Sequence, residues 1–149
     1  MTEIRFYHLQ RRSLDSALPE LLTKSLERGW RCVVQATSAE RLQALDAHLW
    51  TFRDDSFLPH GTAQDPQPED QLVYLTTGPE NPNGATVRFL IEGAEIEDLA
   101  SHERVFFVFD DSDEAAIEKA REAWKAVKAA GHDVTYWKQD AAGRWQKMA

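Results

Sequence analysis

The sequence predicts an α/β fold in which a mostly parallel sheet carries helices on both faces. Segments typical of strands alternate with segments of helical periodicity along the 149 residues. Two strand segments, residues 31–35 (RCVVQ) and 104–109 (RVFFVF), are almost continuously apolar, as expected for strands buried on both faces. Together these patterns predict a doubly wound, Rossmann-like domain that spans residues 1–149 as a single unit.

The first half of the chain divides into four elements. A strand is expected over residues 3–9, and a second, buried strand over residues 31–35. The helix between them should end at Gly29, and Pro19 predicts that it starts late or is kinked. Its apolar face consists of Leu14, Leu18, Leu21, Leu22 and Leu26. Ser38 suits the N-cap of the next helix, whose apolar face consists of Leu42, Leu45 and Leu49.

The second half begins with a loop, expected over the proline-rich residues 53–70. The last long helix should follow an N-cap at Asp111 or Ser112 and end before Gly131. Residues 141–149 are expected to form a tail. The remaining pattern predicts strands over residues 72–75, 86–91, 105–109 and 132–138, with a turn-rich break at residues 78–84.

The distribution of charged residues along the chain limits the kinds of molecule that can bind to it. The formal net charge of −8 is unevenly distributed, because residues 119–149 hold seven basic and three acidic side chains while residues 1–118 hold 10 and 22. Most of the surface should therefore repel nucleic acid phosphates. The asymmetry favours a partner protein that has an acidic patch of its own.

Other signals are absent from the sequence. No signal peptide is evident and no apolar run approaches the ~20 residues of a membrane span, so we expect a cytoplasmic protein without a membrane partner. Cys32 is the only cysteine, which excludes an intramolecular disulfide and a cysteine-based zinc site. Histidine pairs with metal-ligand spacing, phosphate-binding loops and nucleophile elbows do not occur. We therefore expect no catalytic residue, no metal and no cofactor.

One group of acidic residues leaves an enzymatic alternative open. Glu92 follows one predicted strand, and Asp111 and Asp113 follow the next. This set resembles the metal-binding carboxylates of Toprim-like, metal-dependent nucleic acid enzymes. However, only 18 residues separate Glu92 from Asp111, which leaves little room for the crossover of a parallel strand pair. The plainer interpretation is that the aspartates cap the following helix and favour its positive N-terminal end.

The last predicted helix has an unusual second face. At about 100° per residue, five side chains fall within an arc of about 100°: Ile117, Arg121, Trp124, Lys125 and Lys128. Small apolar residues lie about 120° away by the same arithmetic: Ala116, Ala120, Ala123, Val127 and Ala130. The five-residue stripe is either a solvated face with snorkelling cations or a docking site for a ligand both negative and apolar.

A second group of large apolar residues follows the second helix: Trp50, Phe52, Phe57, Leu58 and Pro59. They either fold back as a satellite cluster or stay exposed as an interaction patch. Trp50 is the residue that we most expect to anchor a partner, because tryptophan is enriched at interface hot spots.

Three stretches resemble one protein family: FYHL (residues 6–9), LDAHLWTFRDDSFLPHG (45–61) and AREAWKAVKAAGHDVTYWK (120–138). They are similar in order and spacing to the chi subunits of bacterial DNA polymerase III, accessory proteins of the clamp loader. The resemblance implies a Rossmann-like adaptor that is not an enzyme by itself but a subunit of a DNA-directed DNA polymerase holoenzyme. Such an adaptor acts in DNA replication and meets DNA only indirectly, through single-stranded DNA-binding protein (SSB).

The resemblance also implies two partner sites. The family's site for the acidic C-terminal tail of SSB, which ends in proline and phenylalanine, corresponds to Arg121, Trp124, Lys125 and Lys128. Trp124 replaces the tyrosine of some relatives, and Ile117 would add an apolar contact. The family's contact with the psi subunit corresponds to Trp50, Phe57, Leu58, Pro59 and His60. Because acidic residues crowd this loop, we expect either psi or another clamp-loader subunit as the partner.

Overall fold

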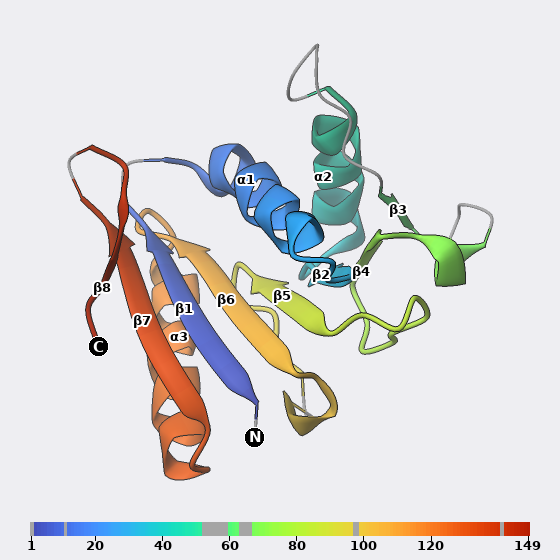
Figure 1. The fold of residues 1–149 in the computed structure, drawn as a ribbon. Coiled ribbons are helices and arrows are strands. Elements are labelled where there is room, and N and C mark those ends of the chain that lie inside the picture. Colours follow the sequence, from blue (N-terminus) through green and yellow to red (C-terminus); the bar gives the residue numbers. More distant parts are fainter. Residues whose placement is uncertain (1, 11, 52–59, 63–66, 97–98, 141) are drawn as a thin grey trace.

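The computed structural model describes residues 2–10, 12–51, 60–62, 67–96, 99–140 and 142–149. In this part of the chain, eight strands form one sheet in the order β3-β4-β2-β5-β6-β1-β7-β8 (Figure 1). All neighbouring pairs are parallel except β7 and β8, which are antiparallel. The strands are β1 (Glu3–Leu9), β2 (Cys32–Gln35), β3 (Gly61–Thr62), β4 (Val73–Thr76), β5 (Val87–Ile91), β6 (Arg104–Asp110), β7 (Asp133–Gln139) and β8 (Trp145–Lys147).

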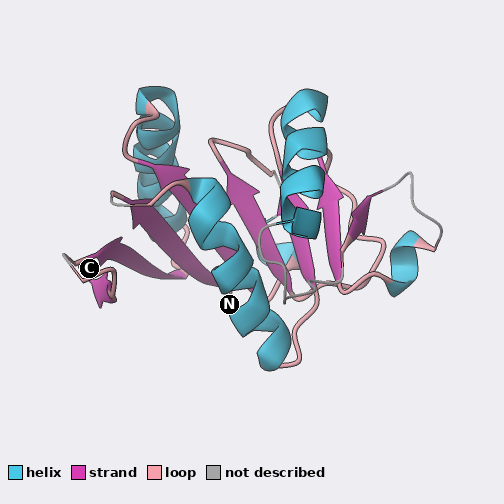
Figure 2. Cartoon of the chain, turned by 90° about the horizontal axis from the view of Figure 1, so that it is seen from above, coloured by secondary structure: helices cyan, strands magenta, loops and turns pink. Residues whose placement is uncertain are grey.

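Helices lie on both faces of this sheet. Helices α1 (Leu14–Glu27) and α2 (Ala39–Thr51) pack on one face, and α3 (Glu114–Ala129) packs on the other. Figure 2 shows α1 and α3 on opposite sides of the strands. Two short 3₁₀ turns, η1 (Pro68–Asp70) and η2 (Leu99–Ser101), lie in the connections. The predicted α/β class with a mostly parallel sheet is therefore confirmed.

The sheet separates two apolar cores, because successive side chains of a strand point to opposite faces. Tyr7 and Phe106 contribute to the α1/α2 side, whereas Phe6 and Phe107 contribute to the α3 side. On α3 the small residues Ala116 and Ala120 are buried, as the helical pattern predicts. Small side chains let this helix lie close to the sheet, which leaves its cationic stripe at the edge of the contact.

Of the two outcomes predicted at Pro19, the late start of helix α1 is wrong. The helix neither starts at this proline nor ends there, since it begins at Leu14 with Ser13 as its N-cap. Proline cannot donate the backbone hydrogen bond that Asp15 O would otherwise accept. Nε2 of His48, on α2, lies 2.7 Å from that carbonyl oxygen instead. A side chain of the neighbouring helix thus satisfies the acceptor that Pro19 leaves open.

Three further details differ from the predicted boundaries. The N-cap of α3 is Asp113, whose Oδ1 accepts a hydrogen bond from Ala116 N at 3.1 Å. Asp111 and Ser112 do not cap this helix because each is engaged elsewhere, with His8 and Asp110 respectively. The predicted tail contains β8, and the predicted loop contains β3 and η1.

None of the helices in the described part of the chain has the length and apolar character needed to cross a bilayer.

Candidate functional site

A groove opens between α3 and β7 and encloses about 370 Å³. That volume lies at the lower end of the range for ligand-binding clefts. It is lined by His8, Phe109, Ile117, Ala120, Arg121, Trp124, Lys125, Tyr136, Lys138 and Ala149. Four of the five stripe residues therefore line one hollow. The exception is Lys128.

Trp124 is fixed in the α3 wall by aromatic neighbours. Its ring meets Phe6 edge-on at 5.4 Å and Tyr136 at 5.7 Å between centroids. The ammonium of Lys128 lies 5.0 Å from the centroid of the Trp124 ring, within the range of a cation–π contact. Trp124 is half-buried, so its ring contributes both to the core and to the groove. Lys128 supports this ring rather than lining the groove.

Cations come from both walls of the groove. Arg121 has a side chain that is 72% exposed, and it forms a long ion pair with Glu118, at 3.6 Å. Lys125 is exposed on the same helix. Lys138 lies across the groove on β7. Sequence reasoning missed Lys138, although the alternation of side chains along a strand places it on the same face as Tyr136.

A chain of hydrogen bonds forms the polar end of the groove. His8 Nε2 lies 2.7 Å from Asp111 Oδ1, and His8 Nδ1 lies 2.7 Å from the Tyr136 hydroxyl. Burial lowers the pKa of His8, against the opposing effect of its hydrogen bond with Asp111. Burial also raises the pKa of Tyr136, with Arg121 acting in the opposite direction. In the free protein both groups therefore favour their neutral forms near neutral pH.

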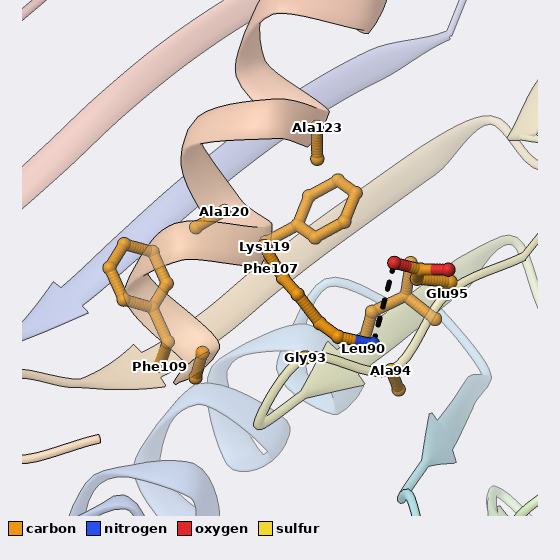
Figure 3. A pocket seen from close by; sticks show the side chains of 10 residues that line it. Leu90, Gly93, Ala94, Glu95, Phe107, Phe109, Lys119, Ala120 and Ala123 are labelled. Atoms are coloured by element: carbon orange, nitrogen blue, oxygen red, sulfur yellow. Dashed lines mark ion pairs between the residues drawn. The ribbon is translucent and has the colours of Figure 1, made fainter. Parts of the chain in front are cut away.

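A smaller hollow lies on the other side of α3. Figure 3 shows it between Phe107, Leu90 and the helix, with the ion pair of Lys119 and Glu95 at 3.6 Å beside it. It encloses only about 20 Å³, which is room for about one water molecule. The groove between α3 and β7 is therefore the better candidate site.

The acidic set proposed for a metal does not come together. Glu92 Oε1 accepts a hydrogen bond from Arg41 Nε at 2.6 Å, Asp111 contacts His8, and Asp113 caps α3. No group of three or more metal-ligating side chains occurs among the residues that the structure describes. The Toprim-like alternative is therefore not supported. The short spacing did not prevent a parallel strand pair, however, because β5 and β6 do pair in parallel across a connection whose described residues form only η2.

The second predicted partner site is only partly visible. Phe57, Leu58 and Pro59, and the side chain of Trp50, lie outside the described residues. His60 is buried, and its Nε2 lies 3.0 Å from Asp46 Oδ1 on α2. His60 thus ties the segment after the loop to the helix before it.

The fold and the groove define a mixed α/β protein with a cationic, aromatic hollow at one end of its sheet. Residues 1–135 match the model of the family described as DNA polymerase III chi subunit, HolC. The chain therefore belongs to the chi subunit family of DNA polymerase III. It is also 27% identical over 159 residues to a Rickettsia prowazekii (strain Madrid E) protein described as "Probable DNA polymerase III subunit chi". That alignment covers 100% of this chain and 93% of the relative.

The family match has a limit that bears on the groove. It includes α3 with Arg121, Trp124 and Lys125, but it ends at residue 135. Tyr136 and Lys138, which line the opposite wall, lie beyond it.

Proposed function

We propose that this chain is a non-catalytic adaptor of the clamp-loader complex that links DNA polymerase III to the acidic C-terminal tail of SSB. Membership of the chi family supports the placement in DNA replication. The observation that carries the docking site is the groove, where Arg121 and Lys125 flank the Trp124 ring on an otherwise acidic protein. In this proposal the protein acts in the cytoplasm, keeps the Rossmann-like topology of the resemblance and meets DNA only through SSB.

The groove matches the chemistry of such a tail. A phenylalanine side chain can stack against Trp124 and contact Ile117, because aromatic pairs favour offset or edge-on packing. Carboxylates of the tail then lie near Arg121 and Lys125, where opposite charges attract. The contact area is small, so we expect a dissociation constant at or above about 1 μM. Salt above the physiological concentration should weaken binding because it screens exposed charges.

The test is calorimetric titration with a synthetic, aspartate-rich peptide that ends in Pro-Phe. The double variant Arg121→Ala/Lys125→Ala should lose most of the binding. The matched control is Lys24→Ala/Lys147→Ala, which removes the same charge from two exposed lysines outside the groove. Equal binding by the two double variants would refute the site, and no binding by the unaltered protein would refute the function.

We also propose a second contact, with psi or another clamp-loader subunit, through Trp50, Phe57, Leu58 and Pro59. His60 would support this patch from within, since it is buried against α2. A pull-down from cell extract tests the proposal. Trp50→Ala should lose a clamp-loader subunit that the unaltered protein retains, whereas Arg121→Ala should retain it. Retention of that subunit by Trp50→Ala would contradict the assignment.

A further inference from the structure

The hydrogen-bond chain at the end of the groove has defined proton positions. An ionised Asp111 carboxylate can only accept, so His8 donates its Nε2 proton across the 2.7 Å contact. In the neutral imidazole, Nδ1 then carries no proton and must accept. The Tyr136 hydroxyl, 2.7 Å away, therefore donates to His8. In this state Tyr136 turns only oxygen lone pairs toward the groove.

Protonation of His8 reverses the second hydrogen bond. Nδ1 gains a proton and donates it to the Tyr136 oxygen, while Asp111 still accepts from Nε2. The Tyr136 proton is then released to point into the groove. The neutral chain thus repels a carboxylate at Tyr136, whereas the protonated chain offers it a hydrogen-bond donor.

We propose that Tyr136 is a carboxylate-binding residue of the groove, and that it accepts this ligand only together with a proton on His8. The inference rests on the proposed function and adds to it a recognition element that lies beyond the family match. The proton balance involves a single proton from solvent. One proton moves from solvent to His8 Nδ1, Tyr136 keeps its own proton, and no covalent bond other than this N–H forms.

The charges around His8 are compatible with this linkage. Asp110, the last residue of β6, and Asp111, which follows it, favour the protonated ring, and Lys138 on β7 disfavours it. Arg121 and Lys125 face the groove from α3. Burial keeps the free ring neutral at neutral pH, since it lowers the pKa of His8 from an ordinary value of 6.5. A bound carboxylate adds a negative charge nearby and so favours proton uptake.

The experiment measures peptide affinity and proton uptake between about pH 8 and about pH 6, the range in which histidine titrates. The probe is the aspartate-rich peptide ending in Pro-Phe, titrated in buffers of different ionisation enthalpy. Affinity should rise as the pH falls, by at most about tenfold per pH unit for one proton. The same peptide with an amidated C-terminus distinguishes the two sources of the carboxylate. Loss of the pH dependence assigns the terminal carboxylate to Tyr136, and its retention assigns an aspartate.

Two variants separate recognition from structure. Tyr136→Phe keeps the ring against Trp124 and Phe109 but lacks the hydroxyl, so the pH dependence should disappear. His8→Asn places an amide N–H near the position of Nδ1, so Tyr136 should become a donor at every pH and the affinity should stay high. The matched control is Tyr74→Phe, whose hydroxyl binds Glu80 away from the groove, and it should keep the pH dependence. Thermal unfolding verifies that each variant is folded.

Each result decides a different question. Binding by the unaltered protein without proton uptake, or an unchanged pH dependence in Tyr136→Phe, would overturn the inference and leave the proposed function intact. No binding at any pH would refute the proposed function itself. Nitrogen-15 NMR of the free protein then still tests the basis of the inference. A His8 ring with its proton on Nδ1 rather than Nε2 would overturn it without any ligand.

Discussion

Lys128 and Arg121 lie on the same stripe of α3, yet the structure predicts different effects on peptide binding when each is replaced by alanine. Arg121 lines the groove, and its exposed guanidinium faces the space where an acidic peptide would lie. Lys128 does not line the groove, and its ammonium rests on the Trp124 ring. The single variants Arg121→Ala and Lys128→Ala therefore separate contact with the ligand from support of the ring.

The expected magnitudes follow from exposure. An exposed ion pair contributes about 0.2–1 kcal/mol, so Arg121→Ala should weaken binding by roughly 1.4-fold to fivefold. Lys128→Ala removes a cation–π contact that contributes about 0.5–1 kcal/mol at exposed sites. Because both partners belong to the protein, this loss lowers the free energy of unfolding rather than the affinity for the peptide. Its remaining effect on the ligand acts through solvent, where the Debye length is about 8 Å at physiological salt. We expect its affinity to change by less than about 1.5-fold.

The assay is fluorescence anisotropy with a labelled tail peptide at physiological salt, with thermal unfolding measured in parallel. Lys128→Ala should lower the unfolding temperature slightly and leave the affinity almost unchanged. Arg121→Ala should lower the affinity and leave the unfolding temperature almost unchanged. A loss of affinity in Lys128→Ala equal to that in Arg121→Ala would refute this reasoning. It would place the peptide on the outer side of Trp124 rather than in the groove.

Three further predictions concern stability and reactivity. Asp113→Ala should destabilise the protein by about 1 kcal/mol because it removes the N-cap of α3, whereas Ser112→Ala should have a smaller effect, and urea unfolding measures both. Arg88→Met should lower the free energy of unfolding by about 3 kcal/mol. The fully buried guanidinium donates to Gln35 Oε1 and to two carbonyl oxygens, and these acceptors would lose their donors. Equal or greater stability of the variant would show that removal of the buried charge outweighs the lost hydrogen bonds. Burial raises the pKa of Cys32 to about 12, so a thiol reagent should label it only after denaturation; labelling of the folded protein at neutral pH would contradict this burial.

Local periodicity predicted those parts of the fold that local contacts decide. The strand Glu3–Leu9 and the buried small residues of α3 follow directly from spacings of two and of three to four residues. The cap of α3 could not be chosen in this way, because Asp111, Ser112 and Asp113 are all suitable residue types. His8 decides the choice by engaging Asp111, and that contact depends on the pairing of β1 with β6.

The strand order and the β7 wall of the groove could not be predicted from the sequence, for a related reason. His8 and Tyr136 are 128 residues apart in the chain, and they meet because β1 pairs with β7. No periodicity within one segment encodes such a pairing. The helical stripe therefore revealed Arg121, Trp124 and Lys125, while His8, Tyr136 and Lys138 became visible only with the sheet.

The uneven charge of the chain limits how salt can act on this groove. The acidic residues of the first 118 positions oppose an acidic peptide, whereas the basic excess of residues 119–149 includes Arg121, Lys125 and Lys138 at the groove. At about 0.01 M salt the Debye length is about 30 Å, so a peptide experiences the repulsion of the whole protein; at about 0.15 M it experiences mainly charges within about 8 Å. Added salt therefore first relieves repulsion and then weakens local attraction. It follows that affinity should pass through a maximum, and that the attraction of the groove is measured by the decline above physiological salt.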